Sequence, residues 1–386
     1  MRFPSSPRSE RVLLSCGASG WGGLEGEVLL LAEAYRRRGL ATALLVQPET
    51  PLALRAQEAG FDCHPCLPLR RADAAGSVLA LARDLRRMRP SFLHVHEGRD
   101  LRVLVPALAM ARTGSALYVT RHMGLRHARR DPWHRWIYGR VRRFYAISHH
   151  VAEEARRVLP LPPERVIVRP PGIDTGRFDP ARVDRAEVRA RLGWAPSDLV
   201  IGMLGRVTAH KGQADLLEAA SLLLPVHPRL RFSFVGSAGR DASEHALEAE
   251  LLRRARTLGP RVSWHPATER PEEFYAAFDV FVFPSHIEAF GLALVEAMAM
   301  RRPVIAAAAA GVLDIVTDGR DGLLYSPGSA AELADRITGL VDHPEMGASL
   351  GTRAREKVLG NWDINRIAEL YIEDFYNDTR YNAESD

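Results

Sequence analysis

The sequence predicts an α/β protein of two domains, each with a parallel sheet, and three observations support this. First, 386 residues are too many for one ordinary core and suit two domains of roughly 100–200 residues each. Second, short apolar runs alternate with helical stretches, which favours parallel strands joined by right-handed crossovers. Third, the alternation stops at the linker-like segment Arg169–Asp174 and then begins again. We therefore expect two Rossmann-like domains that face each other across a cleft, with ligands at the carboxyl ends of the strands.

In the first half of the chain, the candidate strands are apolar runs that end in turn signals. We predict them at residues 11–16, 43–46, 92–96, 116–120, 144–148 and 166–168. A glycine-rich loop follows the first strand, and apolar residues at helical spacing then predict a helix that ends near Arg38. Helical stretches separate most of the other runs. These elements form a predicted first domain of residues 1–175.

The second half repeats the alternation after a charged, helix-prone segment that ends at Leu192. We predict its strands at residues 199–204, 232–235, 262–264, 280–284 and 304–307. They form a predicted second domain of residues 176–361. An amphipathic helix from about Trp362 to Thr379 follows.

Composition excludes several classes of protein. With 46% hydrophobic and 26% charged residues, the chain is neither disordered nor collagen-like, and three cysteines are too few for a disulfide framework. No apolar run approaches the roughly 20 residues that span a bilayer, and residues 1–11 lack the apolar region of a signal peptide. We therefore expect a cytoplasmic protein.

The net charge of +5 is unevenly distributed along the chain. Residues 1–198 contain 33 arginines and no lysine against 20 acidic residues, whereas residues 199–386 contain 19 basic and 27 acidic residues. A basic half indicates an anionic partner, such as a lipid surface, a phosphorylated acceptor or nucleic acid.

One basic segment, Arg121–Phe144, also contains Trp133, Trp136 and Tyr138. Aromatic rings among cations suit a lipid headgroup interface. An ordinary solvated helix has the same composition. A peripheral position on the inner face of a membrane is therefore one of two expectations for this segment.

The most specific motif, Ser285–Met300, follows an apolar strand. Gly291 precedes a predicted helix start at Leu292, where free backbone N–H groups and the helix dipole make an anion site. Glu288 lies just before this helix and Glu296 lies one to two turns inside it. Two carboxylates so placed can accept hydrogen bonds from sugar hydroxyls at either end of a bound phosphate. A capped amphipathic helix with a solvated glutamate gives the same pattern.

A second motif is the loop Gly205–Gly212, which directly follows a predicted strand. A basic, glycine-bounded loop between a strand and a helix is a phosphate-binding arrangement. Arg206 can hold phosphate oxygens through two parallel hydrogen bonds, and Lys211 adds a point charge. Two solvated charges on a loop also fit. However, 50 of the 52 basic residues are arginine and only Lys211 and Lys357 are lysine, so a lysine kept in this loop favours phosphate binding.

A third glycine-rich stretch, Gly20–Gly26, follows the first strand but does not fit the dinucleotide-binding fingerprint. A glycine loop at a strand end can still meet a ligand, which makes Gly22 and Gly23 candidates. His94 and His96 flank the end of another predicted strand. A structural role and contact with an acceptor are equally consistent with that position.

Taken in order, these pieces resemble the retaining glycosyltransferases of family 4, which have the GT-B fold, and the resemblance covers essentially the whole chain. It includes the Gly-Gly loop, His122 after a mid-domain strand, the Gly-Ile-Asp linker, the Gly-Arg-x4-Lys-Gly loop and two glutamates separated by seven residues. The segment Asp318–Leu324 matches the family's Asp-Gly-x2-Gly-Leu-Leu pattern. The fold implies that a C-terminal helix, within residues 362–386, packs back on the first domain.

The resemblance implies a role for each matching residue of the second half. Arg206 and Lys211 would hold the diphosphate of a nucleotide-sugar donor. Glu296 would bind the nucleotide ribose, and Glu288 would bind hydroxyls of the donor sugar. Backbone atoms that would meet the sugar or phosphate belong to Phe290, Gly291 and Leu292.

In the first half, the resemblance implies that Gly22 and Gly23 line the cleft and that His122 lies near the reacting sugar. The candidate catalytic residues are Glu288, His122, Arg206 and Lys211.

The predicted function is transfer of a sugar from a nucleotide diphosphate to a lipid-linked or lipopolysaccharide-type glycan. The resemblance implies retention by front-face attack assisted by the leaving phosphate. We expect no cofactor and no metal. The positive charges of Arg206 and Lys211 would take the place of a metal ion, and no Asp-x-Asp motif occurs. A nucleotide-sugar 2-epimerase of the same fold is the alternative. A nucleic-acid-binding protein is less favoured, because the arginines are scattered and no known nucleic-acid motif occurs, and we expect no specific nucleic acid as a partner.

Overall fold

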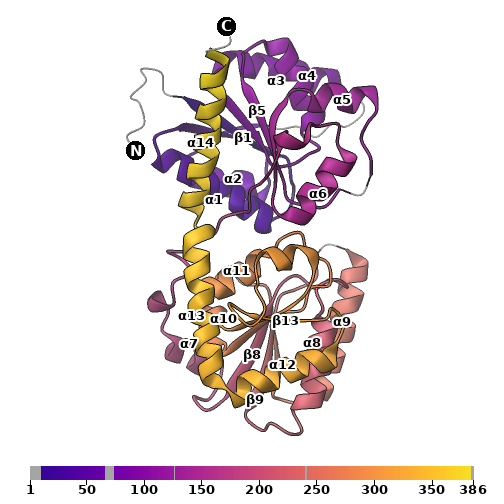
Figure 1. Ribbon diagram of the computed structural model, residues 1–386, viewed down its shortest axis with the longest axis vertical. Helices are drawn as coiled ribbons and strands as arrows, with labels where there is room; N and C mark the ends of the chain where they lie inside the picture. The colour runs from indigo at the N-terminus through magenta and orange to yellow at the C-terminus, as the bar shows by residue number, and fades with distance from the viewer. Residues whose placement is uncertain (1–9, 66–73, 126, 240, 384–386) are drawn as a thin grey trace. The chain divides into compact units, whose positions relative to one another are not determined.

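The computed structural model of the chain describes residues 10–65, 74–125, 127–239 and 241–383 (Figure 1). The chain forms two compact units, each with its own sheet. The first unit comprises Met1–Gly172 and Ile364–Asp386, and the second comprises Ile173–Asp363. The chain therefore enters the second unit once and leaves it once, close to the limits of 175 and 361 expected from the sequence.

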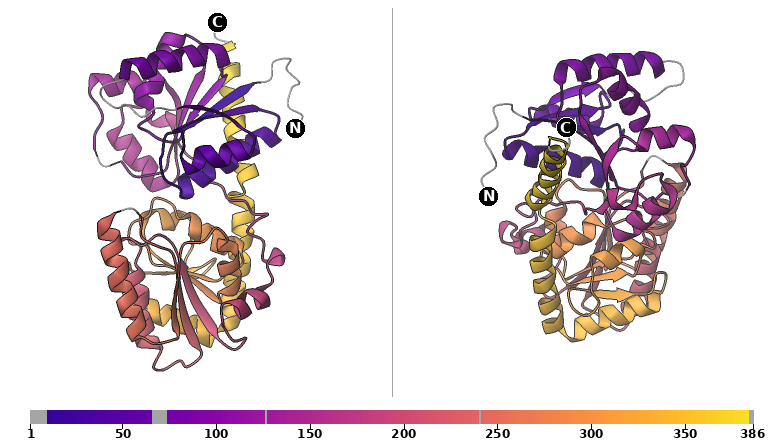
Figure 2. Two further views of the ribbon diagram at one scale, coloured as in Figure 1. Left: turned by 180° about the vertical axis from the view of Figure 1, so that it is seen from behind. Right: turned by 45° about the horizontal axis from the view of Figure 1, so that its top comes forward.

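The first unit is a seven-stranded sheet in the order β3-β2-β1-β4-β5-β6-β7, in which all neighbours are parallel. Helices cover both faces of the sheet (Figures 1 and 2). The strands are β1 (Arg11–Cys16), β2 (Ala41–Val46), β3 (Asp62–Pro65), β4 (Phe92–Val95), β5 (Ala116–Arg121), β6 (Val141–Ala146) and β7 (Val166–Val168). The helices are α1 (Gly23–Arg37), α2 (Pro51–Glu58), α3 (Ala74–Met88), α4 (Leu101–Ala111), α5 (Pro132–Tyr138), α6 (His149–Val158), η1 (Pro163–Arg165) and α14 (Ile364–Ala383).

The second unit is a six-stranded parallel sheet in the order β10-β9-β8-β11-β12-β13. The strands are β8 (Leu199–Leu204), β9 (Leu230–Val235), β10 (Val262–His265), β11 (Val280–Phe283), β12 (Val304–Ala307) and β13 (Leu323–Tyr325). The helices are η2 (Pro180–Arg182), α7 (Arg185–Arg191), α8 (Gln213–Leu223), α9 (Ala242–Thr257), α10 (Pro271–Ala277), α11 (Leu292–Ala299), η3 (Ala310–Asp314), α12 (Ala330–Asp342) and α13 (Pro344–Asn361). The prediction of two Rossmann-like domains with parallel sheets is thus confirmed.

Each sheet has one place where the order of the strands reverses. In the first unit the reversal lies between β1 and β4, and in the second it lies between β8 and β11. The chain leaves the two central strands in opposite directions at such a point, which opens a crevice at their carboxyl ends. Topology alone therefore marks the loops after β1 and β4 in one unit, and after β8 and β11 in the other, as candidate ligand sites.

Two differences from the predicted strands have a physical cause. β6 begins at Val141, three residues before the predicted start at residue 144. The prediction began too late because Arg142 and Arg143 make the first residues of the strand polar. In the structure the Arg143 guanidinium donates two hydrogen bonds of 2.8 Å to Asp378 of α14, which satisfies the charge within the fold. β3, which the sequence did not predict, is a short edge strand whose residues are partly exposed, so it lacks the apolar run of a central strand.

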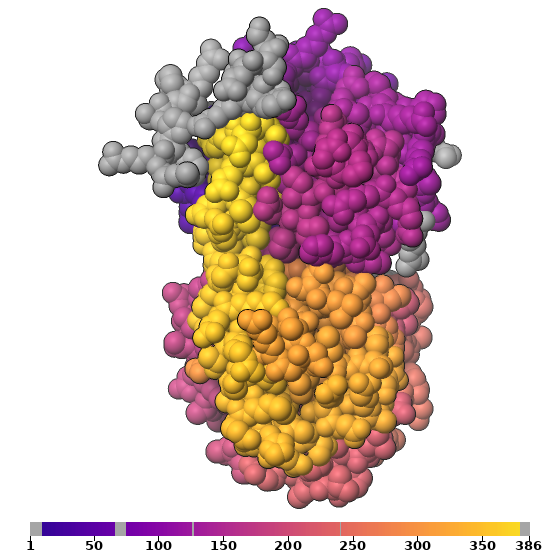
Figure 3. Space-filling model, in the orientation of Figure 1, coloured from indigo at the N-terminus to yellow at the C-terminus, as the bar shows by residue number. Residues whose placement is uncertain are grey.

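The C-terminal helix α14 packs on the first unit, as the resemblance implied. Its buried residues include Ile367, Tyr371 and Phe375, which join the core of that unit. Asp374 adds ion pairs of 2.8 Å with Arg169 and 3.2 Å with Arg143. Figure 3 shows the outer face of this helix, in yellow, at the surface of the first unit.

We expect Phe375→Ala to lower the free energy of unfolding of the first unit by about 3–5 kcal/mol. The Phe375 side chain is fully buried, and its ring lies 4.9 Å from that of Phe92 and 4.5 Å from that of Tyr118. Denaturant unfolding followed by circular dichroism measures the loss. The exposed Glu373 on the same helix supplies the control, because Glu373→Ala should change the free energy of unfolding by less than about 0.5 kcal/mol. Similar losses in both variants would contradict the packing described.

Candidate functional site

The β8–α8 loop, residues 205–212, is fixed against the end of β11. Gly212 has a φ of 72°, in the left-handed region that favours glycine. A Cβ atom at this position would lie 2.0 Å from the carbonyl oxygen of Pro284, the residue that follows β11. Close by, the backbone N–H of His286 donates a 2.8 Å hydrogen bond to the carbonyl of His210. Only a glycine at position 212 therefore allows the two loops to meet in this way.

This close approach brings Lys211 to Glu288. The Lys211 Nζ atom lies 2.5 Å from Glu288 Oε2 and 5.5 Å from the centroid of the Phe283 ring. The Lys211 side chain keeps 29% exposure and that of Glu288 keeps 17%. An ammonium group has three N–H donors, and this contact uses one of them. Lys211 can therefore still bind an anion that approaches from solvent.

Arg206 lies on the same loop but is far more exposed. Its Nε atom is 3.8 Å from Glu244 Oε1, and 66% of its side chain is exposed. The other carboxylate oxygen of Glu244 accepts a 2.7 Å hydrogen bond from the N–H of Gly239. An exposed ion pair contributes at most about 1 kcal/mol. The Arg206 guanidinium can therefore exchange this partner for an anionic ligand at little cost.

The segment Glu288–Leu292 leads into α11 and leaves the start of that helix without a side-chain cap. Gly291 has a φ of 122°, and a Cβ atom there would approach the Phe283 ring to 3.3 Å. Phe290 is buried and packs edge to face on Trp362, with the ring centroids 6.0 Å apart. The first N–H groups of a helix have no partner within the helix. The start of α11 therefore offers a positively polarised surface to an anion.

Glu296 lies one turn inside α11, where its carboxylate meets Tyr275. The Tyr275 hydroxyl donates a 2.9 Å hydrogen bond to Glu296 Oε2. Burial raises the pKa of Glu296 to about 7, although the Tyr275 hydrogen bond and the Arg177 charge act in the opposite direction. Near neutral pH this carboxyl group is therefore divided between its charged and neutral forms.

In the first unit, the glycine-rich loop after β1 is anchored by an acidic residue that the sequence analysis missed. Asp100 accepts a 2.6 Å hydrogen bond from the Ser15 hydroxyl and a 3.0 Å one from the Gly17 N–H. Burial raises the pKa of Asp100 to about 6, although these two hydrogen bonds act in the opposite direction. The loop then ends at Gly22, an extended N-cap without a side-chain hydrogen bond, and α1 begins at Gly23.

Three further titratable residues, Glu27, His96 and His122, form a group that we call the Glu27 cluster. His122 Nδ1 lies 3.4 Å from Glu27 Oε2, and His122 Nε2 lies 3.1 Å from His96 Nδ1. Burial raises the pKa of Glu27 to about 8, although the backbone N–H of Gly172 acts against the shift. Burial lowers the pKa of His122 to about 3, and the charge of Arg121 adds to the effect. Both imidazole rings are therefore neutral at physiological pH, since burial also lowers the pKa of His96.

Family models now identify the chain. A model described as Glycosyltransferase Family 4 matches residues 21–177, and a model described as Glycosyl transferases group 1 matches residues 184–357. The chain belongs to the family 4 glycosyltransferases. The resemblance inferred from the motifs is thus confirmed.

Individual relatives agree with the family models. A D-inositol 3-phosphate glycosyltransferase from Thermomonospora curvata is 35% identical over 239 residues, which cover 58% of this chain and 55% of the relative. The chain spans about half the length of the curated relatives it matches.

Solved structures share the fold. HepE from Anabaena, in complex with UDP and glucose, has a TM-score of 0.80 at 22% identity over 95% of this chain and 99% of its own. A glycosyltransferase from Rickettsia africae has a TM-score of 0.85 at 17% identity, with coverage of 96% and 98%. At these identities the likeness establishes the GT-B fold alone.

The predicted site residues are divided between the two units. Among those of the second unit, a direct contact joins Lys211 to Glu288, whereas Arg206 and Glu296 are held by other partners. In the first unit, His122 contacts two residues that were not named as site residues. The roles that the resemblance implied for all of these residues stay predictions.

Glu27 escaped the sequence analysis although a signal was present. It lies on the buried face of α1 with Leu31 and Tyr35, four and eight residues further on. An acidic residue is rarely buried on the apolar face of a helix, and those that are buried often belong to functional sites. The helical spacing could therefore have singled it out.

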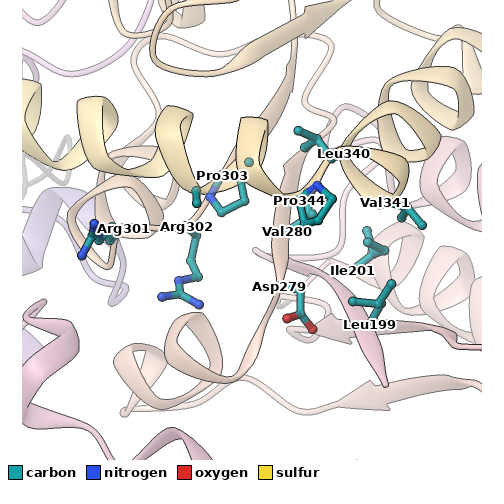
Figure 4. Close-up of a pocket in the computed structure, with 12 residues that line it drawn as sticks. Leu199, Ile201, Asp279, Val280, Arg301, Arg302, Pro303, Leu340, Val341 and Pro344 are labelled. Carbon is teal, nitrogen blue, oxygen red and sulfur yellow. The ribbon is translucent and has the colours of Figure 1, made fainter. Parts of the chain in front are cut away.

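A cavity of about 360 Å³ lies elsewhere in the second unit (Figure 4). Its walls include Asp279, Arg302 and Pro303 at the starts of β11 and β12, together with residues of α12 and α13. It therefore lies at the amino ends of the strands, whereas the β8–α8 loop follows a carboxyl end. None of the predicted donor-binding residues lines it.

We expect Gly212→Ala to lower the free energy of unfolding of the second unit by more than about 1 kcal/mol, because a positive φ and the Pro284 carbonyl both oppose a Cβ atom. Thermal and denaturant unfolding measure the change. Gly205→Ala at the other end of the loop is the matched control, since a Cβ atom there meets nothing within 4 Å. A loss in Gly205→Ala as large as that in Gly212→Ala would contradict this account of the loop.

Proposed function

We propose that this protein transfers a sugar from a nucleotide-diphosphate donor to a glycan acceptor, with retention of anomeric configuration. The observation that carries the proposal is the contact between Lys211 and Glu288. It joins the loops after β8 and β11, the two strands between which the order of the second sheet reverses. A cation and a carboxylate are thus paired at the place where a parallel sheet of this kind binds its ligand.

The proposed chemistry uses these groups to stabilise the leaving diphosphate. Cleavage of the bond between sugar and phosphate leaves negative charge on the diphosphate and positive character on the sugar. The Lys211 ammonium, the Arg206 guanidinium and the uncapped start of α11 would face the negative charge, and fixed donors of this kind lower the barrier of charge-forming reactions. Glu288, once Lys211 turns toward the diphosphate, would accept hydrogen bonds from hydroxyls of the donor sugar.

Retention without a covalent enzyme intermediate is part of the proposal. A double displacement needs a free carboxylate that attacks the sugar. In the proposed donor complex Glu288 would be engaged by hydroxyls of the donor sugar, and Glu296 is engaged by Tyr275. Attack by the acceptor from the face of the leaving phosphate needs no such group, and the departing phosphate can take up the acceptor's proton.

The names of similar proteins support a sugar nucleotide as the donor. The solved structure of HepE contains UDP and glucose, and related complexes of HepE contain UDP alone or UDP-glucose. Curated relatives are named D-inositol 3-phosphate glycosyltransferases. The proposal requires no metal at the diphosphate, because Lys211 and Arg206 supply the positive charge.

We expect Lys211→Ala to raise the barrier of sugar transfer by about 2–4 kcal/mol, which is roughly a 30- to 1000-fold loss of turnover. The donor is first found by thermal shift with UDP-, GDP- and ADP-sugars, since a ligand of the native state raises the melting temperature. Turnover is then measured with that donor, in the presence of a chelator, and proton NMR of the product reports its anomeric configuration.

The other lysine of the chain provides the control. Lys357 pairs with Asp321 at 2.9 Å and belongs to α13, so Lys357→Ala should leave the turnover of the folded protein unchanged. Full turnover of a folded Lys211→Ala variant would refute the role of Lys211. An inverted product would refute retention, and release of free nucleotide and an epimerised sugar without any acceptor would indicate an epimerase.

For the acceptor, we propose a lipid-linked or lipopolysaccharide-type glycan reached at an anionic membrane surface. Trp133 is 46% exposed and stacks on Trp136, with the ring centroids 5.1 Å apart, and the Arg140 guanidinium lies 4.3 Å over the Trp136 ring. Exposed tryptophans beside arginines suit a headgroup region. None of the helices in the described ranges is both long and apolar enough to cross a bilayer.

We expect the protein to float with vesicles that contain anionic phospholipid at low salt, and Trp133→Ser to reduce the floated fraction. Neutral vesicles and high salt should abolish flotation, because the attraction is electrostatic and screened. Trp21 is another exposed tryptophan of the first unit, at 43% exposure, so Trp21→Ser is the matched control. Equal flotation with neutral and anionic vesicles would contradict the proposal.

A further inference from the structure

The Glu27 cluster lies where the first sheet reverses its strand order. Glu27 belongs to α1, the helix that follows β1, whereas His96 and His122 directly follow β4 and β5. β4 pairs with both β1 and β5. Three elements that are distant in the sequence thus converge at the carboxyl edge of the sheet, and the sequence-predicted His122 lies in the middle of the cluster.

The contacts of His122 tie its protons to those of its neighbours. The 3.1 Å contact between His122 Nε2 and His96 Nδ1 requires a proton on one of the two nitrogens and a lone pair on the other. A neutral imidazole carries a single N–H. If that N–H is at Nε2 of His122, a lone pair at Nδ1 faces Glu27, which must then be protonated. If it is at Nδ1, Glu27 can remain a carboxylate. The tautomer of His122 and the proton of Glu27 are therefore coupled.

The cluster also contains polar atoms that the fold leaves unsatisfied. The buried Nε2 atom of His96 has no hydrogen-bond partner. The two buried carboxylate oxygens of Glu27 make no hydrogen bond of good geometry, although the N–H of Gly172 lies close enough to oppose the rise of the Glu27 pKa. The Glu27 side chain is 1% exposed, and that of His122 is 10% exposed. Burying such groups costs stability. An arrangement of this kind is typical of sites where the fold gives up stability for function.

No guanidinium or ammonium compensates Glu27 among the residues that the structure describes. The phenols of Tyr35 on α1 and Tyr371 on α14 lie near it, and both are neutral because burial raises the pKa of each hydroxyl. Arg169, near both phenols, forms its ion pair with Asp374 at 2.8 Å. Within this surrounding, His122 is the titratable group at ion-pair distance from Glu27.

We propose that Glu27 is a positioning residue that fixes the tautomer and the orientation of His122 during sugar transfer. The inference rests on the proposed function, because it assigns a part in that reaction to the first unit. Both ring nitrogens of His122 face protein groups, so its proton is set by Glu27 and His96 rather than by solvent. The first unit would then present a histidine of one defined tautomer.

The test compares three variants of α1. Glu27→Gln keeps the size of the side chain but cannot gain or lose a proton, and Glu27→Leu removes the polar contact. Glu33→Gln is the matched control, since Glu33 is a partly exposed residue of the same helix that pairs with Arg37. We expect Glu27→Leu to lower kcat at least about tenfold with the donor KM within about twofold, by analogy with other carboxylates that orient a catalytic imidazole. In Glu27→Gln, the inflection of the rate near pH 8 should disappear.

Two readouts do not depend on activity. Nitrogen-15 NMR of the histidine rings reports which nitrogen of His122 carries the proton, and a His122→Asn variant assigns the signal. We expect one tautomer in the wild type and in Glu33→Gln, and a changed or mixed population in Glu27→Leu.

The second readout is the pH dependence of stability. The pKa of Glu27 is about 8 in the fold and near 4.5 when unfolded, so the folded state holds an extra proton between these values and loses stability as the pH rises through them. The difference in melting temperature between Glu27→Gln and the wild type should therefore shift in favour of the variant as the pH rises from about 6.5 to 8.5.

Each outcome decides the proposal. Histidine tautomers, pH profile and melting temperatures that match Glu33→Gln in every Glu27 variant would overturn it. A stoichiometric divalent metal in the purified wild type that Glu27→Gln lacks would also overturn it, because the cluster would then be a metal site. If the wild type transfers no sugar from any donor, the proposed function fails, while the tautomer measurement still tests the link between Glu27 and His122.

Discussion

The candidate donor site depends on the close approach of two backbones at Gly212. The carbonyl of Pro284 occupies the space that any side chain at position 212 would need. Because Gly212 has no side chain and leaves this space to the carbonyl, the loop after β8 meets the end of β11, and the His286 N–H can reach the His210 carbonyl. Lys211, the residue before the glycine, is then held beside Glu288. A steric requirement at one glycine thus decides which charges face each other at the point where the sheet reverses.

Three glutamates show how the surroundings give one side-chain type different states. Glu288 is partly exposed and forms an ion pair with the Lys211 side chain. Glu296 accepts a hydrogen bond from Tyr275, and burial raises its pKa to about 7. Glu27 makes no hydrogen bond of good geometry, and burial raises its pKa to about 8. Near neutral pH Glu296 is divided between its charged and neutral forms and Glu27 is mostly neutral, whereas the contact that defines Glu288 is an ion pair. The surroundings of one residue type thus separate binding roles from proton-handling roles.

The parts of the molecule that the sequence predicted are those that local patterns specify. Most of the strands appeared as apolar runs, and the donor-site motifs appeared as glycines and charges at strand ends. The parts that it missed depend on residues far apart in the chain. Ser15 and Asp100 are 85 positions apart, and Arg143 and Asp378 are 235 apart. Glu27 is recognised as the buried partner of His122 only once the fold brings α1 to the residue that follows β5. Periodicity shows which face of a helix is buried, but it does not show what that face meets.

The scarcity of lysine directed attention to Lys211, and the structure shows what that scarcity means physically. Lys357 has nearly the same surroundings, since its Nζ atom lies 2.9 Å from Asp321 and 6.0 Å from the Trp362 ring, much as Lys211 lies beside Glu288 and Phe283. Both ammonium groups are about three-quarters buried between a carboxylate and an aromatic ring, a space that suits a compact charge better than a planar guanidinium. Both lysines thus occupy positions where the space beside a carboxylate is narrow, and this holds whether or not a ligand binds there. The two differ in position and in contacts. Lys357 lies within a helix and also donates to the Thr317 hydroxyl at 3.3 Å, whereas Lys211 lies on the loop that follows a central strand and has two donors still unused.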